Sequence, residues 1–281
     1  MYIDLLCHAC YNISMAFSID SIFTTRTALP KNGVIVEIEP IAALKPYVRC
    51  FWTHERGKRD HYSRIIPDCC ADIIINTEDC GAGFVGMCTD SFAAENVDTV
   101  FGIRFYAWAV PQFTRINAVQ LFNSVINPQY LFSNFTEFKD RIIAAKSTAE
   151  RVALANKYLI YLLDSQCDCD VMNSLYGIIR SNGNISVNDL SRGIAVSKRT
   201  LERKFMQNVG VSPKTITELI RYQLLWQDCI GNRFYALDSV EKFGYYDQAH
   251  MYNDFKKYHG IGLGDARLEY FNLSRFYNTV D

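Results

Sequence analysis

Two short stretches of this 281-residue chain place basic and amide side chains along what would be one face of a helix. Arginine can donate two hydrogen bonds to guanine, glutamine or asparagine can pair with adenine, and lysine binds phosphate oxygens. The first stretch supplies Ser197, Lys198, Arg199, Thr200, Glu202, Arg203 and Gln207, and the second supplies Gln248, His250, Tyr252, Asn253 and Lys256. These residue types predict two helices that contact double-stranded DNA.

Apolar residues that must position these stretches repeat with a fixed offset. Leu201 and Met251, Phe205 and Phe255, and Gly210 and Gly260 are each fifty positions apart, which indicates two copies of one supersecondary unit. In the first copy the apolar residues follow the i, i+4 spacing of a buried stripe, and Ser197 is a suitable N-cap. Each copy is therefore predicted to be a helix-turn-helix, whose second helix can enter the major groove.

A longer helix is predicted between the two copies, from about Pro213 to Gly231, with Ile216, Leu219, Ile220 and Leu224 facing inward. It would hold the two units at the spacing of successive major-groove segments. An ordinary helical bundle with a solvated charged face is the alternative. Residues 171–270 hold thirteen Lys or Arg against ten Asp or Glu, which is a weaker basic excess than most DNA-binding domains carry.

The doubled pattern resembles the DNA-binding domain of AraC/XylS-family transcription regulators over roughly residues 171–269. The residues that carry it are Ser197-Lys-Arg-Thr-Leu201-Glu-Arg203-Lys-Phe205, Gly210-Val-Ser-Pro213 with Arg221, and Gly244-Tyr-Tyr-Asp247-Gln-Ala-His250 with Phe255-Lys256. The resemblance implies two helix-turn-helix units bridged by a long helix, DNA as partner, and RNA polymerase as a second partner if the protein is an activator.

Four positions depart from the family pattern. Ser191 replaces the usual Ala, and Ala195 replaces a turn Gly, where a left-handed backbone would disfavour alanine. Asn253 occupies a slot often held by Arg, and its shorter side chain would remove a strong phosphate or base contact. Leu263 stands where the family has Pro, which would weaken the cap of a short last helix.

Residues 34 to about 105 are predicted to form short strands, at 34–38, 47–53, 63–66, 72–76 and 102–105. Pro40, Pro46, Pro67 and the Gly81 to Gly86 stretch separate them. Strands of this length and spacing suggest a small barrel or sandwich. The fold class is therefore expected to be α+β, a β-rich sensor domain followed by an all-α domain with two helix-turn-helix units.

Part of this region resembles a domain of unknown role found at the N-terminus of some AraC-family regulators. The resemblance spans about residues 36–135 through Leu44-Lys-Pro46-Tyr-Val48, Phe51-Trp52, Ile66-Pro67-Asp68 with Asp72-Ile-Ile, and Gly102-Ile-Arg104-Phe105. By analogy it would sense a small molecule. Aromatic walls with one acid and one base can orient a ligand, so Trp52, Asp68, Arg104 and Phe105 are the candidate ligand residues. Alternatively, both rings are core and Asp68 pairs with Arg104.

The chain is expected to divide into an unplaced segment 1–33, the β-rich domain 34–145, a connector helix and hinge 146–170, the DNA-binding domain 171–270 and a tail 271–281. Ser147-Thr-Ala-Glu150 is a capping box. The apolar stripe that follows it, Val152, Ala155, Leu159, Leu162 and Leu163, would either cover the β-domain or pair with a second copy in a homodimer. Asp164 to Asp170 is the expected hinge.

Composition predicts a cytoplasmic protein without a membrane span, cofactor or bound metal. The ten cysteines include Cys7-His-Ala-Cys10 and the Cys167-Asp-Cys169 pair, but no second CxxC exists to complete a zinc site. The adjacent pair Cys69-Cys70 could sense redox state. We therefore predict a sequence-specific transcription regulator and not an enzyme. Two alternatives remain: a DNA alkyl-acceptor that uses a reactive cysteine, and an interaction module that has lost DNA binding.

Overall fold

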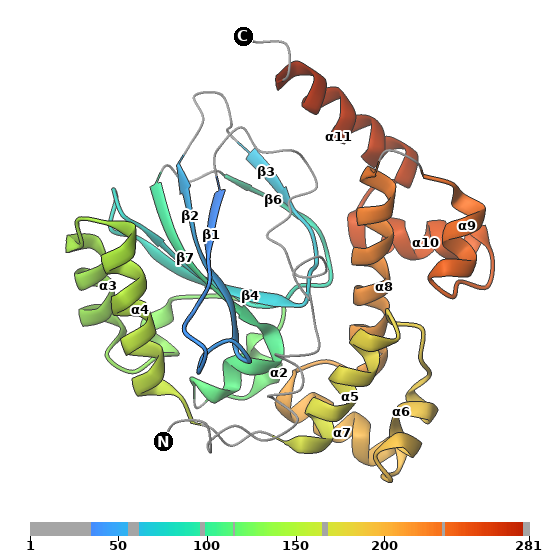
Figure 1. The fold of residues 1–281 in the computed structure, drawn as a ribbon, viewed down its shortest axis with the longest axis horizontal. Coiled ribbons are helices and arrows are strands. Elements are labelled where there is room, and N and C mark those ends of the chain that lie inside the picture. Colours follow the sequence, from blue (N-terminus) through green and yellow to red (C-terminus); the bar gives the residue numbers. More distant parts are fainter. Residues whose placement is uncertain are drawn as a thin grey trace.

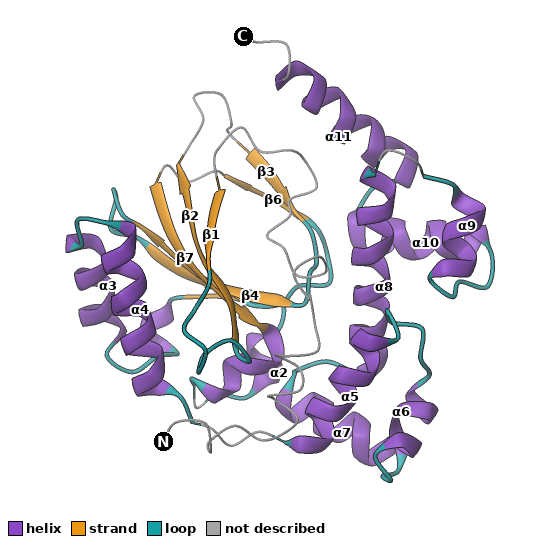
Figure 2. Cartoon of the chain, viewed as in Figure 1, coloured by secondary structure: helices purple, strands orange, loops and turns teal. Residues whose placement is uncertain are grey.

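The computed structural model describes residues 35–55, 62–95, 99–114, 116–164, 168–231 and 234–277. Figure 1 shows a β-rich half from the first part of the chain beside a helical half from the last part. Figure 2 shows the same division by secondary structure. The α+β architecture predicted from the sequence is therefore confirmed. Expectations for residues 1–33 and for Cys7, Cys10 and Cys167 lie outside the described residues.

A six-stranded antiparallel sheet frames the first half, in the order β1-β2-β7-β4-β5-β8, and β3 pairs with β6 in a separate ribbon. The strands are β1 (Ile35–Ile38), β2 (Val48–Glu55), β3 (Tyr62–Ile65), β4 (Cys70–Asn76), β5 (Ala82–Val85), β6 (Phe92–Glu95), β7 (Thr99–Tyr106) and β8 (Val125–Ile126). The five predicted strands correspond to β1, β2, β3, β4 and β7. The sequence therefore located the three long strands β2, β4 and β7 and two short ones, and it missed the short strands β5, β6 and β8.

The sequence was misleading at β5, which lies within the Gly81 to Gly86 stretch expected to be a turn. Glycine and alanine have low strand propensity, and Phe84 is the fully buried side chain of β5. The strand nevertheless pairs with β4 from Asp72↔Val85 to Ile75↔Ala82. A strong neighbouring strand therefore imposes extended structure where local propensity predicts a turn.

One face of the sheet packs against helices. Phe105 of β7 contacts Phe113 and Phe132 at centroid distances of 5.2 and 6.2 Å. Beyond them lie η3 (Ala107–Gln112), α2 (Ala118–Leu121), η4 (Pro128–Tyr130), α3 (Phe135–Ala144) and α4 (Thr148–Leu162). The predicted capping box starts α4, because Ser147 Oγ accepts from the Glu150 amide at 3.2 Å. The apolar stripe of α4 packs into this core and thus covers the β-rich half.

The helical half contains α5 (Cys169–Arg180), α6 (Val187–Gly193), α7 (Lys198–Asn208), α8 (Pro213–Ile230), α9 (Ala236–Lys242), α10 (Gln248–His259) and α11 (Leu263–Tyr277). The repeated apolar anchors are fully buried: Leu201, Phe205, Met251 and Phe255 each expose 0% of their surface. Gly210 and Gly260 end the two units with φ of 87° and 85°. The last helix has fifteen residues. It is therefore not the short helix expected after Leu263, and it continues past residue 270.

The two halves share a packed interface. The buried apolar residues of both form one continuous cluster. Across it the Gln223 side-chain amide donates to the Pro67 carbonyl oxygen, and Ser91 Oγ donates to the His259 carbonyl oxygen at 2.8 Å. At the end of α7 the halves approach so closely that a Cβ on Gly210 would lie 2.5 Å from the Ala118 carbonyl oxygen. The helical half is therefore fixed against the loops and α2 of the β-rich half at several points.

Candidate nucleic-acid interface and ligand site

The first candidate contact surface is the outer face of α7. Ser197 caps the helix by accepting from the Thr200 amide at 3.1 Å, and the buried side of the helix carries Leu201 and Phe205. The helical period then turns the remaining predicted residues outward. Ser197, Lys198, Arg199, Arg203 and Gln207 are exposed, whereas Thr200 and Glu202 are half-buried.

Ion pairing on α7 leaves two of its cations free. Lys204 binds Asp168 and Asp170 at the start of α5, with N–O distances of 2.8 and 2.7 Å. The hydrogen bonds that its ammonium group donates to these two carboxylates raise the pKa of Lys204. Arg199 and Arg203 have no ion-pair partner among the described residues. The charge that α7 offers to an external partner is therefore concentrated at these two arginines.

The second candidate surface is the outer face of α10. Asp247 caps it through the His250 amide at 2.7 Å. Tyr252, Asn253 and Lys256 are exposed, while Gln248 and His250 are half-buried. His250 is partly engaged within the protein: its Nε2 lies 3.6 Å from Asp254 Oδ2, and its ring lies 5.3 Å from that of Tyr245. The outer face of α10 therefore carries less free positive charge than that of α7.

The helix α8 holds the two surfaces apart. Figure 1 shows α6 and α7 near one end of α8 and α9 and α10 near the other. Its eighteen residues rise by roughly 27 Å at 1.5 Å per residue, which is comparable to the spacing of about 34 Å between successive major-groove segments. Trp226, Tyr222 and Leu219 of α8 are fully buried, so side-chain packing fixes this spacing.

The sequence did not identify Tyr246, which exposes 91% of its surface in the turn before α10. Its neighbour Tyr245 is 5% exposed and packs under the guanidinium of Arg221 at 5.1 Å. The Tyr245-Tyr246 pair lies outside the helical stretches, so the helical spacing of residues could not indicate that Tyr246 is exposed. The exposed ring of Tyr246, beside the start of α10, extends this candidate surface.

Three of the four candidate ligand residues lie together on the other face of the sheet. Trp52 Nε1 donates to Asp72 Oδ1 at 2.9 Å, and Arg104 Nη1 donates to Asp72 Oδ2 at 2.7 Å. Arg104 Nη2 also pairs with Asp68, as the alternative interpretation of the sequence had it. Asp72 was missed, although an acidic residue within an otherwise apolar strand was a visible signal for it.

This cluster is tightly built. Burial alone would lower the pKa of Arg104, but the carboxylates of Asp68 and Asp72 raise it well above its ordinary value. A Cβ on Gly102 would lie 2.0 Å from Trp52 Cε2, so the indole can lie against β7 because that position is glycine. Arg104 Nε has no hydrogen-bond partner among the described residues. The cluster therefore combines a fixed aromatic face with a spare buried donor.

Phe105 does not belong to this cluster, which corrects the candidate set. Consecutive residues of a strand point to opposite faces, and Phe105 is fully buried in the helix-covered core. Adjacent residues 104 and 105 could not have lined one pocket. The ligand candidates that the structure brings together are therefore Trp52, Asp68 and Arg104, joined by Asp72.

Burial suppresses the reactivity of five described cysteines, whereas Cys80 and Cys169 are exposed. Burial is the largest cause that raises the pKa of Cys50 and of Cys88 to about 12, and it also raises the pKa of Cys69, Cys70 and Cys229. Thiols held protonated are weak nucleophiles. Within the described ranges no three or more His, Cys, Asp or Glu side chains form a group that could hold a metal. None of the described helices is long and apolar enough to span a membrane.

Comparison with known proteins gives two findings. Residues 36–127 match the model of a domain of unknown function, DUF6597, which overlaps the N-terminal resemblance noted above. Similar solved structures include ToxT from Vibrio cholerae O395, at 8% identity over 85% of this chain and 97% of that one with a TM-score of 0.38. A 1.65 Å structure of Vibrio cholerae ToxT gives 7% identity over 85% and 98% with a TM-score of 0.41. No curated protein sequence matches the chain. Structural similarity at this level carries no argument about function.

Proposed function

We propose that this chain is a sequence-specific, DNA-binding transcription regulator of the AraC/XylS type, whose β-rich half senses a small molecule or mediates dimerisation. The observation that carries the proposal is the pair of equivalent helices α7 and α10, each buried along one side and exposed along the predicted contact side. The placement of these two helices toward opposite ends of one buried helix supports entry into successive major-groove segments.

Within this proposal, the exposed arginines of α7 supply most of the base and phosphate contacts. Arg199 and Arg203 are free of internal ion pairs among the described residues, and a guanidinium can contact guanine through two hydrogen bonds. On α10, Tyr252, Asn253 and Lys256 contact the neighbouring groove segment, with Gln248 and His250 at its entrance. Because the positive charge is modest, DNA recognition would depend on contacts from a few individual side chains more than on long-range electrostatic attraction.

Selection of bound duplexes from a random pool by the full chain, repeated at several salt concentrations, tests the proposal directly. We expect enrichment of a bipartite site whose halves are about one helical turn apart. The logarithm of the binding constant should fall with the logarithm of salt concentration by about 0.9 per phosphate contact. Lys146→Ala, which removes an exposed charge between α3 and α4, is the control. Absence of any enriched sequence would favour the interaction module that has lost DNA binding.

The interface between the halves offers a route for regulation. Asp68 of the Arg104 cluster directly follows Pro67, whose carbonyl oxygen accepts from Gln223 of α8. Ser91 of the β-rich half bonds the last residue of α10, His259. A ligand that displaces Asp68 from Arg104 would therefore act on the helix that spaces the two DNA-contacting units. Gln223→Leu should alter DNA affinity while leaving the selected sequence unchanged.

A reactive-cysteine function has weaker support, because the described buried thiols are held protonated. Mass spectrometry after incubation with alkylated DNA tests it. Transfer of an alkyl group to a cysteine of the chain would replace the regulator proposal with the alkyl-acceptor alternative.

A further inference from the structure

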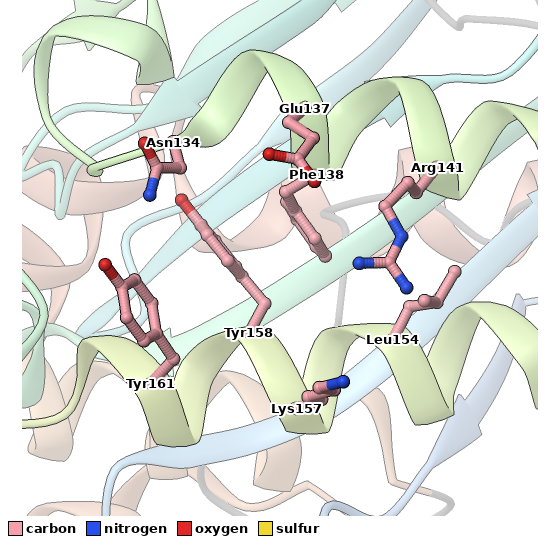
Figure 3. Close-up of a pocket in the computed structure, with 8 residues that line it drawn as sticks. All are labelled: Asn134, Glu137, Phe138, Arg141, Leu154, Lys157, Tyr158 and Tyr161. Atoms are coloured by element: carbon pink, nitrogen blue, oxygen red, sulfur yellow. The ribbon is translucent and has the colours of Figure 1, made fainter.

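A pocket opens between the side chains of α3 and α4. These two helices lie on the outer side of the β-rich half, away from α7 and α10 (Figure 1). Its volume is about 200 Å³. Figure 3 shows side chains from both helices converging on it. The lining includes Glu137, Phe138 and Arg141 of α3 and Lys157, Tyr158 and Tyr161 of α4.

The floor of this pocket is aromatic and rigid. Phe138 and Tyr158 stack with ring centroids 4.0 Å apart and planes at 7°. The Tyr158 hydroxyl donates to the Ser133 carbonyl oxygen at 2.8 Å, which fixes the orientation of its ring. Tyr161 is 68% exposed and forms an aromatic wall beside this floor. The apolar surface is therefore present before any ligand arrives, so binding requires little reordering.

Two cations line the pocket and are not used elsewhere in the described part of the chain. Other basic residues nearby are engaged: Lys139 bonds the Cys80 carbonyl oxygen at 3.1 Å, and Arg151 bonds the carbonyl oxygens of Ile142 and Ala145. Arg141 and Lys157 have no ion pair or side-chain hydrogen bond among the described residues. Glu137 is the single acidic residue of the lining, which leaves the pocket with a net positive charge.

We propose that this pocket binds a small aromatic carboxylate. Its ring would pack against Tyr158 and Tyr161, and its carboxylate would accept hydrogen bonds from the Arg141 guanidinium and the Lys157 ammonium group, an arrangement stronger than neutral pairs. The space suits a single ring with a short acid side chain, because a cavity of about 150 Å³ accommodates benzene. The site is separate from the Trp52–Arg104 cluster and does not depend on DNA binding.

Phenylacetate is the probe, titrated against the full chain and followed by calorimetry and ligand-observed NMR. Phenylacetamide keeps the ring without the charge, and acetate keeps the charge without the ring. We expect phenylacetate to bind and both comparators to bind at least about tenfold more weakly, because each lacks one half of the recognition. Binding of phenylacetamide equal to that of phenylacetate, or no binding of phenylacetate at concentrations up to about 10 mM, overturns the proposal.

Variants then locate the site. Arg141→Gln combined with Lys157→Gln should weaken phenylacetate binding at least about tenfold, and Tyr161→Ala about fivefold through loss of an aromatic contact. Lys146→Gln, with one charge removed outside the pocket, should bind as the wild type does. Circular dichroism verifies that each variant is folded. Unchanged binding by the folded double variant would place phenylacetate elsewhere and contradict the assignment. If sedimentation shows that a dimer is lost on Tyr161→Ala while phenylacetate does not bind, the surface belongs to a second copy.

Discussion

The two helix-turn-helix units share one plan and differ in how they are held. In both, a helix begins at a side-chain cap, buries two apolar residues one turn apart and ends at a left-handed glycine. The first unit keeps free arginines on its outer face. The second carries less free charge but is anchored internally, because His259 at its end lies buried between Tyr222, Trp226 and Phe255. The two units therefore have the same fold but different charges on their outer faces.

The largest effect on stability should come from the buried phenylalanine that both units share, which is Phe205 in the first and Phe255 in the second. Phe205→Ala and Phe255→Ala each remove a ring with 0% exposure and should each lower the free energy of unfolding by roughly 3 to 5 kcal/mol. Urea denaturation measures both. Similar losses would show that the copies contribute equally to the core, whereas a loss below about 1 kcal/mol at either position would show that its ring is not packed as the structure has it.

The next largest effect is a pH dependence of the free energy of unfolding, which comes from His259 in the second unit. Burial lowers the pKa of His259 from 6.5 to about 4, so the folded protein keeps this ring neutral. As pH falls below 6.5 the unfolded chain binds the proton first, and stability should fall by about 1.4 kcal/mol per pH unit, or roughly 3 kcal/mol by pH 4. Denaturation between pH 7 and 5 should show this slope in the wild type and lose it in His259→Gln. His250→Gln, on the outer face of the same helix, should keep the slope.

DNA affinity should then reveal the difference in surface charge. Arg203→Ala should weaken binding to a selected duplex by about 1 to 3 kcal/mol, the range for a base contact, without changing stability. Asn253→Ala on the second unit should cost less, under about 1 kcal/mol, as expected for a neutral hydrogen bond. Fluorescence anisotropy with a labelled duplex measures both. If Asn253→Ala costs more than Arg203→Ala, the second unit is the main reader.

The smallest effect concerns the turns. Ala195 in the first unit has a φ of 56°, and Gly244 in the second has a φ of 66°. A left-handed backbone costs alanine about 1 to 2 kcal/mol, of which the greater chain entropy of glycine offsets part. Ala195→Gly should therefore stabilise the protein by up to about 1 kcal/mol. Gly244→Ala should destabilise it by at least about as much, because its Cβ would also lie 2.3 Å from Asn184 Oδ1 and displace that side chain. Thermal unfolding measures both variants, and a second comparison of Gly244→Ala in an Asn184→Ala background isolates the backbone contribution at that turn. A destabilising Ala195→Gly would show that the first turn does not favour glycine.

The sequence predicted most where it repeats. The fifty-residue offset located the buried anchors of both units, because helical burial leaves a strong periodic pattern. The sequence predicted less of the structure of the sheet. β5 depends on pairing with β4, which no local pattern records, and Asp72 joined the Trp52–Arg104 cluster through a register that the sequence does not state. Phe105 was assigned wrongly although the alternation of a strand already separates it from Arg104.

The apolar cluster that runs unbroken from the sheet into the helical half limits how this protein can be rearranged. A graft of the last hundred or so residues onto a different N-terminal domain would leave Gly210 and Gln223 facing a surface of another shape. The two halves therefore fit each other as a matched pair. A folded chimera would have to keep Ala118, Pro67 and Ser91 together with the helical segments that contact them.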